Sequence, residues 1–559
     1  MRGQAARTAL PVLLLLIVIG GASLLPILRL LAMAVAPAGS IDFSPLLKLF
    51  ARATVIRATL NTLDTSVFGM VVAVLIGGPA ALLVSMTDLP CRRALGFLLL
   101  IPLMVAPQIT ALSWAHLLGP SSTLLNLFGI APPAGAGNPL LGRGGIILLY
   151  GVQEAPIVFV TLRAGLAGIP RDFIEAARGS GAYPLRALFD IVLPLMRPYL
   201  VAGAALAFVG CVGNFGIPAL LGLPVGYLTL STLIYQQLSS MGPEVLPQVA
   251  GLSVVVGVLA LAGVGVQFLA LSGRNRQFAT AAPARLELGR WRLPVAVLVG
   301  LFLLVMIVLP VAGLVGTALI PAYGVPLTPA TLTFDNFAEV LLRQASTVRA
   351  FSNSTWLAGG AALILAALAI PLAVAADPLP RAARRAVQGV ADLSYALPGV
   401  ALSIAVILLF LRPLPLIGSL YATASIILVA YLMRFLPLAL KPVATAVNQI
   451  PSDLMEAAAS SGAGPLRRLM TITAPLAAPS AIAGALLVFM SAFSELTVSA
   501  LLWSGGHETV GVILFSLEGA GLATQAAAVA VTTIVVVVVL LLAVDRLGRR
   551  LPAGVLPWR

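Results

Sequence analysis

The sequence predicts an all-α integral membrane protein, with about 12 transmembrane helices arranged as two parallel tandem six-helix repeats. Hydrophobic residues make up 60% of the 559 residues and charged residues only 9%, which is typical of membrane proteins. Apolar runs of about 20 residues, long enough to cross a hydrocarbon core roughly 30 Å thick, recur along the chain. A polar segment at residues 170–194 also recurs at 451–475, each time between apolar runs. One structural unit is therefore predicted twice.

The predicted spans divide evenly between two halves, 1–271 and 294–559, which the polar stretch 272–293 connects. We expect spans at 10–36, 61–86, 94–118, 145–169, 198–221 and 245–271, and again at 294–320, 353–376, 387–411, 420–447, 479–503 and 523–544. Six spans per half is an even number, so the repeats should lie parallel to each other. The segment 43–60 is expected to be either a helix along the membrane surface or a solvated loop.

Basic residues indicate the orientation of the chain. With both termini in the cytoplasm, 23 of the 33 Lys and Arg residues fall in inner segments and six in outer loops. This bias places both polar segments in the cytoplasm. It also explains the net charge of +14 without nucleic acid, because the basic residues form no aromatic-interleaved patch. Cys91 and Cys211 lie in different predicted compartments, so no disulfide is expected.

The repeated polar segment predicts a helix, a glycine corner and a second helix. Asp172 and Asp453 are good N-cap residues, each with Glu three positions later. Gly181 and Gly462 can end the helix in the left-handed conformation, and a proline suits the start of the next helix. Nine positions match between the copies: Pro170, Asp172, Glu175, Ala176, Ala177, Gly181, Pro184, Ile191 and Pro194 match Pro451, Asp453, Glu456, Ala457, Ala458, Gly462, Pro465, Ile472 and Pro475.

The pattern Glu-Ala-Ala, three residues, Gly, nine residues, Ile-x-Leu-Pro from Glu175 to Pro194 resembles the signature of permease subunits of binding-protein-dependent ABC importers. The second copy departs from it only at Ala474, where the signature has Leu. Two such domains in one chain resemble the ferric-iron importer permeases, with thiamine, 2-aminoethylphosphonate and polyamine systems as relatives. The resemblance implies the type I ABC importer permease fold in a bacterial inner membrane.

The same resemblance implies the partners and the residues that meet them. Both loops would dock on a cytoplasmic ABC ATPase dimer, and a periplasmic solute-binding protein would deliver cargo. The implied coupling residues are Glu175, Ala176, Ala177, Gly181, Glu456, Ala457, Ala458 and Gly462. The glutamates could equally serve only to cap their helices. The chain has no Gly-x4-Gly-Lys-Ser/Thr phosphate loop, so a partner must bind ATP, and we expect neither enzymatic activity nor a cofactor.

Four polar residues within predicted spans are candidates for the transport path, because such residues are costly in lipid and usually face water or one another. Glu154 and Arg434 occupy neighbouring register positions, and we expect a salt bridge between them, more as a structural lock than as a gate. Glu495 matches Asn214, and a carboxylate there would suit a hard cation such as ferric iron. A hydrogen bond to a neighbouring helix is an equally good reading of Glu495.

The sequence therefore favours the permease of an ATP-driven importer, with ferric iron as the expected cargo. An ion-gradient-driven secondary transporter could also have 12 spans in two parallel halves, but it has no need of two ATPase docking loops. A membrane enzyme ranks last, since no nucleophile, base or metal-ligand set is clustered. His116, His507 and Glu508 lack metal-ligand spacing, and we predict no metal site.

Overall fold

The computed structural model describes residues 15–37, 40–133, 135–169, 171–181, 183–240, 244–271, 287–413 and 418–548. Ten helices within these ranges are long and apolar enough to cross a membrane, and three pairs of shorter helices pass the same test as bent units. The ten helices and two of the bent pairs correspond to the 12 predicted spans. The chain is thus an all-α, multi-pass membrane protein.

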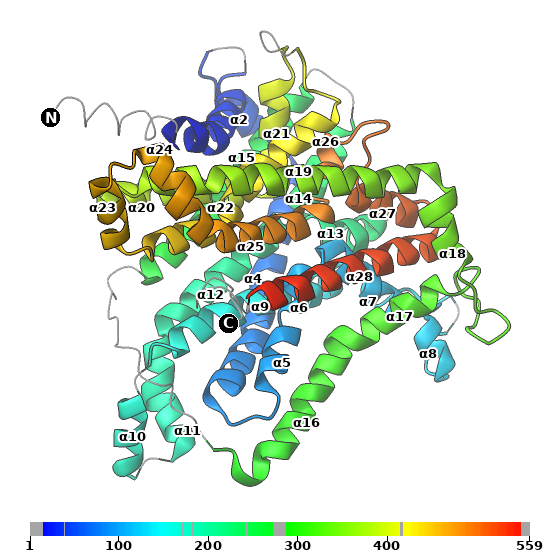
Figure 1. Ribbon diagram of the computed structural model, residues 1–559. Helices are drawn as coiled ribbons and strands as arrows, with labels where there is room; N and C mark the ends of the chain where they lie inside the picture. Colours follow the sequence, from blue (N-terminus) through cyan, green and yellow to red (C-terminus); the bar gives the residue numbers. More distant parts are fainter. Residues whose placement is uncertain are drawn as a thin grey trace.

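Each half is built around three long helices that pack on one another. In the first half these are α4 (Ala53–Met86), α9 (Arg143–Leu166) and α12 (Leu193–Gly213). In the second half they are α19 (Ala345–Ala376), α22 (Ala424–Asn448) and α25 (Ala474–Phe493). Figure 1 shows the first bundle in its lower part and the second above it. The same three spans of each half thus form its core.

The third span of each half is broken. In the first half α5 (Arg92–Leu98) and α6 (Ile101–Met104) are followed by α7 (Pro107–Leu118), with a bend of 101°. In the second half α20 (Arg381–Ala396) and α21 (Gly399–Phe410) meet at 98°. Both breaks precede a proline or glycine that opens the next helix, so the predicted spans 94–118 and 387–411 exist but are not straight.

The first span of each half packs against the other half. After η1 (Gly20–Leu24), α2 (Leu25–Val35) packs on α21. In the second half η4 (Gly289–Trp291), α16 (Arg292–Leu303) and η5 (Leu304–Val308) lead to α17 (Leu309–Ala318), which packs on α7. The two halves are therefore intertwined rather than simply side by side.

A pair of short helices separates the fifth and sixth spans of each half, and the sequence did not predict it. In the first half α13 (Gly216–Leu221), η3 (Leu223–Val225) and α14 (Leu230–Leu238) precede α15 (Val245–Leu271). In the second half α26 (Ser499–Leu502) and α27 (Val510–Gly519) precede α28 (Ala523–Gly548). The predicted spans 198–221 and 479–503 ended too late along the chain, because α12 ends at Gly213 and α25 at Phe493.

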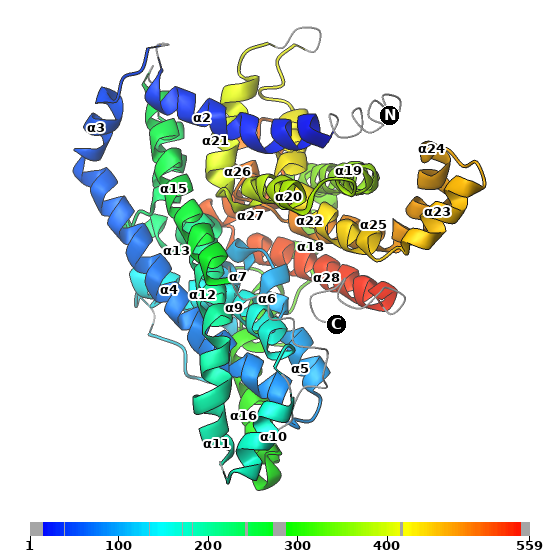
Figure 2. The same cartoon turned by 90° about the vertical axis from the view of Figure 1, so that its left-hand side faces the viewer.

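Two elements that we call elbows project from one end of the molecule. The first elbow consists of α10 (Arg171–Gly179), α11 (Pro184–Ala187) and η2 (Leu188–Val192). The second consists of α23 (Ser452–Ser460), α24 (Pro465–Arg468) and η7 (Leu469–Thr473). Both lie at the left of Figure 1, and Figure 2, which faces that end, shows them on separate flanks. We call this the elbow end.

The opposite end, the far end, carries short helices between the spans. These are α3 (Ser44–Phe50), α8 (Thr123–Leu127), α18 (Asp335–Ala338) and η6 (Glu339–Arg343). The predicted surface helix within 43–60 is α3, and it packs on α15, since a Cβ built at Gly251 would lie 2.9 Å from both Leu46 and Leu49. Most of the predicted connection 272–293 lies outside the described residues.

Candidate functional site

Both elbows turn at the glycines that the sequence singled out. Gly181 and Gly462 have φ of +80°, the left-handed region that side chains other than glycine rarely adopt. In the second elbow the amide of Ala463 donates to the carbonyl of Ala458, and the amide of Gly462 donates to that of Ala459. This is the Schellman pattern of helix termination. The predicted glycine corners are confirmed.

The predicted N-caps are wrong by two residues or more. α23 begins at Ser452 with Pro451 as its N-cap, so Asp453 lies inside the first turn. α10 begins no later than Arg171, which places Asp172 inside its first turn as well. A proline needs no amide partner and can precede the helix directly, while a carboxylate in the first turn still meets the positive end of the helix dipole.

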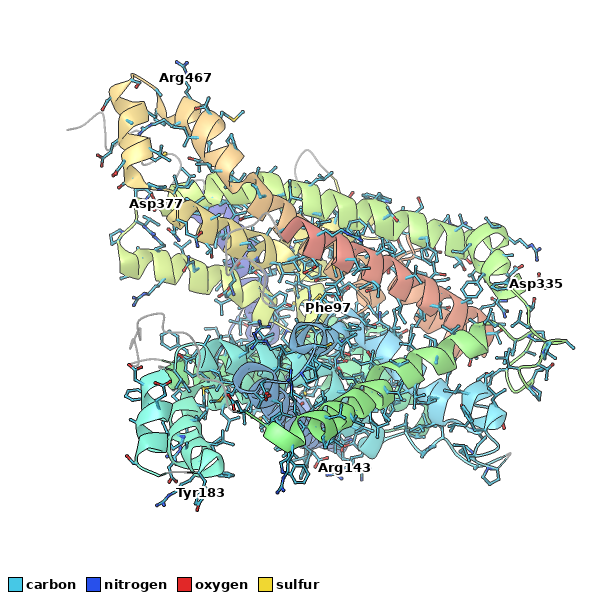
Figure 3. The ribbon with its side chains drawn as sticks, turned by 60° about the horizontal axis from the view of Figure 1, so that its bottom comes forward. Phe97, Arg143, Tyr183, Asp335, Asp377 and Arg467 are labelled. Atoms are coloured by element: carbon cyan, nitrogen blue, oxygen red, sulfur yellow. The ribbon has the colours of Figure 1, made fainter. Side chains whose placement is uncertain are left out.

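The Glu-Ala-Ala residues present the same face in both elbows. Glu175, Ala176, Glu456 and Ala457 are exposed, whereas Ala177 and Ala458 are half-buried. Figure 3 shows Tyr183 of the first elbow and Arg467 of the second at the same end of the molecule, opposite Asp335 at the start of α18. Phe173 and its match Leu454 also remain 44% and 47% exposed. Exposed apolar side chains beside small residues suit the docking of a partner.

Asn214 and Glu495, the matched path candidates, both cap the short helix that follows the fifth span. The Asn214 side-chain oxygen accepts from the amide of Ile217 at 3.1 Å. The Glu495 carboxylate accepts from the amides of Val498, at 2.8 and 2.9 Å, and Ser499, at 3.1 Å. Both side chains are buried, so these bonds satisfy groups that would otherwise be costly. The structure gives Glu495 a hydrogen-bonding role, but its partners are the amides three and four residues later and not a neighbouring helix.

Arg434 and its match Gln153 hold the break in the third span of their own half. Gln153 donates to the carbonyl of Val105 at 3.1 Å, and Arg434 donates to that of Leu397 at 3.4 Å. Each acceptor is the first residue after the helix that precedes the break. A Cβ built at Gly399 would lie 2.8 Å from the Arg434 guanidinium, so glycine makes room for it. The carbonyl at the break is thus bonded by the Gln153 side-chain amide in the first half and by the Arg434 guanidinium in the second.

The expected salt bridge between Glu154 and Arg434 is absent from the described residues, and that prediction is wrong. The Glu154 carboxyl group instead lies against Gly210 of α12, where any Cβ would overlap it. Arg434 turns toward Leu397 within its own half. Neighbouring register positions therefore did not make the two side chains a pair.

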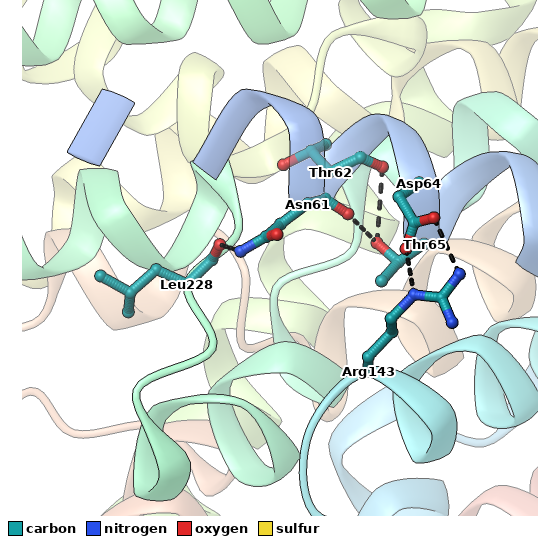
Figure 4. A network of polar contacts seen from close by, with 6 residues as sticks. All are labelled: Asn61, Thr62, Asp64, Thr65, Arg143 and Leu228. Carbon is teal, nitrogen blue, oxygen red and sulfur yellow. Dashed lines mark hydrogen bonds and ion pairs between the residues drawn. The ribbon is translucent and has the colours of Figure 1, made fainter. Parts of the chain in front are cut away.

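The short helices α14 and α27 are fastened to the second span of their half by matched residues. Asn61 donates to the carbonyl of Leu228 at 2.9 Å, as Figure 4 shows, and Asn353 donates to that of Glu508 at 3.0 Å. One position later, the hydroxyls of Thr62 and Ser354 accept from the first amides of α14 and α27, at 2.8 and 2.9 Å. The two helices are thus attached to the second span of their half by equivalent hydrogen bonds.

Matched aromatic residues meet between the halves. Tyr235 and Phe515 are each the sixth residue of their helix, α14 and α27. Their ring centroids lie 5.9 Å apart in an edge-to-face arrangement, and Phe215 contacts both rings. Residues related by a pseudo-twofold axis can touch only at that axis. Because α14 and α27 were not predicted from the sequence, this contact was not predicted either.

One ion pair has no counterpart in the second half. Arg143, at the start of α9, binds Asp64 of α4 through two hydrogen bonds of 2.5 and 2.9 Å (Figure 4). The position that matches Asp64 is Trp356. Asp64 therefore fastens two helices of one half. In the part of the chain that the structure describes, no three His, Cys, Asp or Glu side chains come together as metal ligands.

Residues 7–313 and 367–555 match the protein family described as "Binding-protein-dependent transport system inner membrane component". The chain is 26% identical over 554 residues to a probable ABC transporter permease protein, y4fN, of Sinorhizobium fredii strain NGR234, covering 96% of this chain and 94% of that one. It is 24% identical over 378 residues to the Fe(3+)-transport system permease protein FbpB 2 of Haemophilus influenzae, covering 66% of this chain and 70% of that one. The "Putative 2-aminoethylphosphonate transport system permease protein PhnU" of Salmonella choleraesuis is 27% identical over 187 residues, or 33% of this chain and 64% of that one.

Proposed function

The chain belongs to the family of binding-protein-dependent transport system inner membrane components, and we propose that it imports ferric iron as a fused two-domain permease. Members of this family are ABC importer permeases, so the chain is a transport protein and not an enzyme. The proposed domains are residues 1–271 and 294–559, joined by a cytoplasmic linker at 272–293. Ferric iron is favoured because the match to the Fe(3+) permease, at 378 residues, is longer than either half. The 187 residues matched in the 2-aminoethylphosphonate permease fit within one half.

The observation that carries the mechanism is the pair of equivalent elbows at one end of the molecule. Each continues through a short π-helical turn directly into the fifth span, α12 or α25. A displacement of the elbow therefore reaches the core bundle without an intervening flexible loop. We infer that a dimer of cytoplasmic ABC ATPases docks on Glu175, Ala176 and Ala177 in one elbow and on the matched residues of the other. Gly181 and Gly462 fix the angle at which each elbow meets its ATPase.

A periplasmic solute-binding protein would deliver cargo to the far end. The binding protein would largely determine which cargo is transported, because three of the four polar candidates for the transport path already form structural hydrogen bonds within the permease. Glu495 and Asn214 cap helices, and Arg434 holds a break. Of the four candidates, Glu154 remains the one for direct contact with passing cargo.

Uptake of radioactive ferric iron by cells that express this chain with its ATPase and binding protein tests the cargo. We expect uptake to withstand a protonophore, to fall with an inhibitor of the ATPase, and to survive excess thiamine, 2-aminoethylphosphonate or spermidine. Sensitivity to the protonophore alone would instead favour a gradient-driven carrier. Loss of uptake with one of the competitors would reassign the cargo.

Cysteine labelling tests the orientation in the inner membrane. Tyr183→Cys and Asp335→Cys place exposed thiols at the two ends of the molecule, in a chain from which Cys91 and Cys211 have been removed (Figure 3). A membrane-impermeant maleimide should label position 335 in spheroplasts and position 183 only in inverted vesicles. The reverse pattern would overturn the cytoplasmic position of the elbows.

A further inference from the structure

One ion pair joins the two halves at the far end. His116, near the end of α7 in the first half, lies with its Nε2 3.5 Å from Oε2 of Glu518, near the end of α27 in the second half. The other far-end ion pairs among the described residues, Asp64 with Arg143, Glu339 with Arg343 and Arg349 with Glu508, each lie within one half. Separation of the halves at this end must break the contact between His116 and Glu518 and leaves the other three intact.

The surroundings of His116 and Glu518 make their attraction depend on the charge of His116. His116 is only 2% exposed, and the structure gives neither of its ring nitrogens a hydrogen-bond partner. The Glu518 Oε2 atom is likewise buried without one. At 3.5 Å, with no hydrogen bond formed, the attraction is mainly Coulombic and requires a proton on His116.

Tyr323, in the connection after α17, completes the environment. Its ring lies 5.2 Å from the His116 ring, centroid to centroid. Burial raises the pKa of Tyr323 to about 12, with the Glu518 charge as a smaller cause, so its hydroxyl stays neutral in the working range. The titratable groups that face the contact are then His116 from α7, Glu518 from α27 and the neutral Tyr323 from the connection.

The pair lies next to the place where the halves meet on the axis. Glu518 is three residues after Phe515, so the two side chains share one side of α27. Phe515 in turn contacts Tyr235 of the other half. A movement that parts these two rings therefore also draws Glu518 away from His116.

We propose that His116 and Glu518 form a proton-dependent latch that holds the far ends of the two halves together until ATP binding separates them. This inference rests on the proposed function, in which the far end faces the periplasm and opens to receive cargo. Histidine side chains change charge between pH 5 and 8, within the range that a bacterial exterior spans. Acid conditions then strengthen the latch and keep the far end closed, and rising pH releases it.

The experiment measures the separation of the far ends directly. Spin labels at Gln236→Cys and Ser516→Cys, matched exposed positions of α14 and α27, report the distance across the axis in the complex with ATPase and binding protein. Cys91 and Cys211 are replaced beforehand. Between pH 5.5 and 8 we expect the ratio of open to closed far ends in the unmodified pair to rise about five- to tenfold, the low end of the range for coupling between two sites.

Two substitutions of His116 separate a charge latch from a packing role. His116→Gln removes the charge and should give a pH-independent ratio at the high, open level. His116→Lys keeps a charge at every pH and should give a pH-independent ratio at the low, closed level. Asp64→Asn is the matched control, since it breaks a far-end pair within one half, and it should leave the pH profile unchanged.

Several results would overturn the latch. These are a ratio of open to closed far ends that does not change with pH in the unmodified pair, a pH dependence that persists in His116→Gln, or equal ratios in the Gln and Lys variants. Failure of the proposed function looks different. In that case ATP would change the distance in none of the variants, while the pH comparison at equilibrium would still decide whether the latch exists.

Discussion

The left-handed glycine corners give the most direct test of coupling, through replacement of both Gly181 and Gly462 by alanine or by valine. Their φ of +80° costs an L-amino acid about 1–2 kcal/mol. A Cβ at either position would meet nothing within 4 Å, so the penalty comes from the backbone alone and not from a clash. At each elbow, the ratio of the native corner to other conformations should therefore fall about 5- to 30-fold. Valine should cost more than alanine because it is β-branched.

The assay compares ATP-coupled uptake with membrane insertion in the same cells. The double variants should insert normally, because both corners lie outside the candidate spans, but they should lose coupled uptake, with valine worse than alanine. Asparagine, which tolerates the left-handed region, should retain most activity. The matched control is Gly464→Ala, because Gly464 has a negative φ of −66° and equally open surroundings. Undiminished uptake in the valine variant would refute the rigid-corner reasoning.

Three further changes probe the packing around the path. Gly77→Ala should lower the free energy of unfolding by about 1–3 kcal/mol, because the new Cβ would overlap the carbonyl oxygen of Ala155. Gly78→Ala is the control, since the nearest atom to its Cβ lies 3.9 Å away, and it should change the free energy of unfolding little in the same thermal melts. Combined Tyr235→Ala and Phe515→Ala should raise passive ion leak in proteoliposomes without ATP, and an unchanged leak would exclude a sealing role for this contact. Asp64→Asn removes a half-exposed ion pair and should lower the free energy of unfolding by at most about 1 kcal/mol with unaltered uptake; a larger loss of either would show that the pair does more than join two helices.

The helices of the fold could be predicted because lipid forces apolar runs to become helices and because the chain repeats its plan. The glycine corners followed from a residue type that alone adopts positive φ cheaply. The helix starts at Asp172 and Asp453 were misplaced, since a preceding proline can occupy the N-cap position without an amide partner. Hydropathy also could not show that α12 and α25 end early, because the short helices that follow them are as apolar as the spans.

The error in pairing Glu154 with Arg434 has a similar origin. Register gives the position of a residue along its helix, but not the partner toward which a long side chain turns. Arg434 turns to the free carbonyl at the break of its own third span, an acceptor that exists only once α20 and α21 part. The Pro398–Gly399 pair marks that break in the sequence, but it was not used in predicting the span 387–411. A matched polar residue, Gln153, was the available signal, since equal positions in a repeat tend to serve equal structural needs.

Glu495 could serve as a ligand for the cargo or as a structural helix cap, and comparison with its match in the first half distinguishes the two roles. Its match Asn214 does the same capping without a charge, so the charge is not needed for the fold at that position. If Glu495 is only a cap, Glu495→Gln should keep the bond to the Val498 amide and leave iron uptake within about twofold of the unmodified chain. Glu495→Leu should instead lower stability by about 1–3 kcal/mol, because buried amides lose their acceptor. If the Glu495 carboxylate instead binds ferric iron during transport, the Glu495→Gln variant should be folded and stable but should transport iron more than tenfold more slowly. Measuring uptake and thermal melting of the same variants distinguishes the two roles.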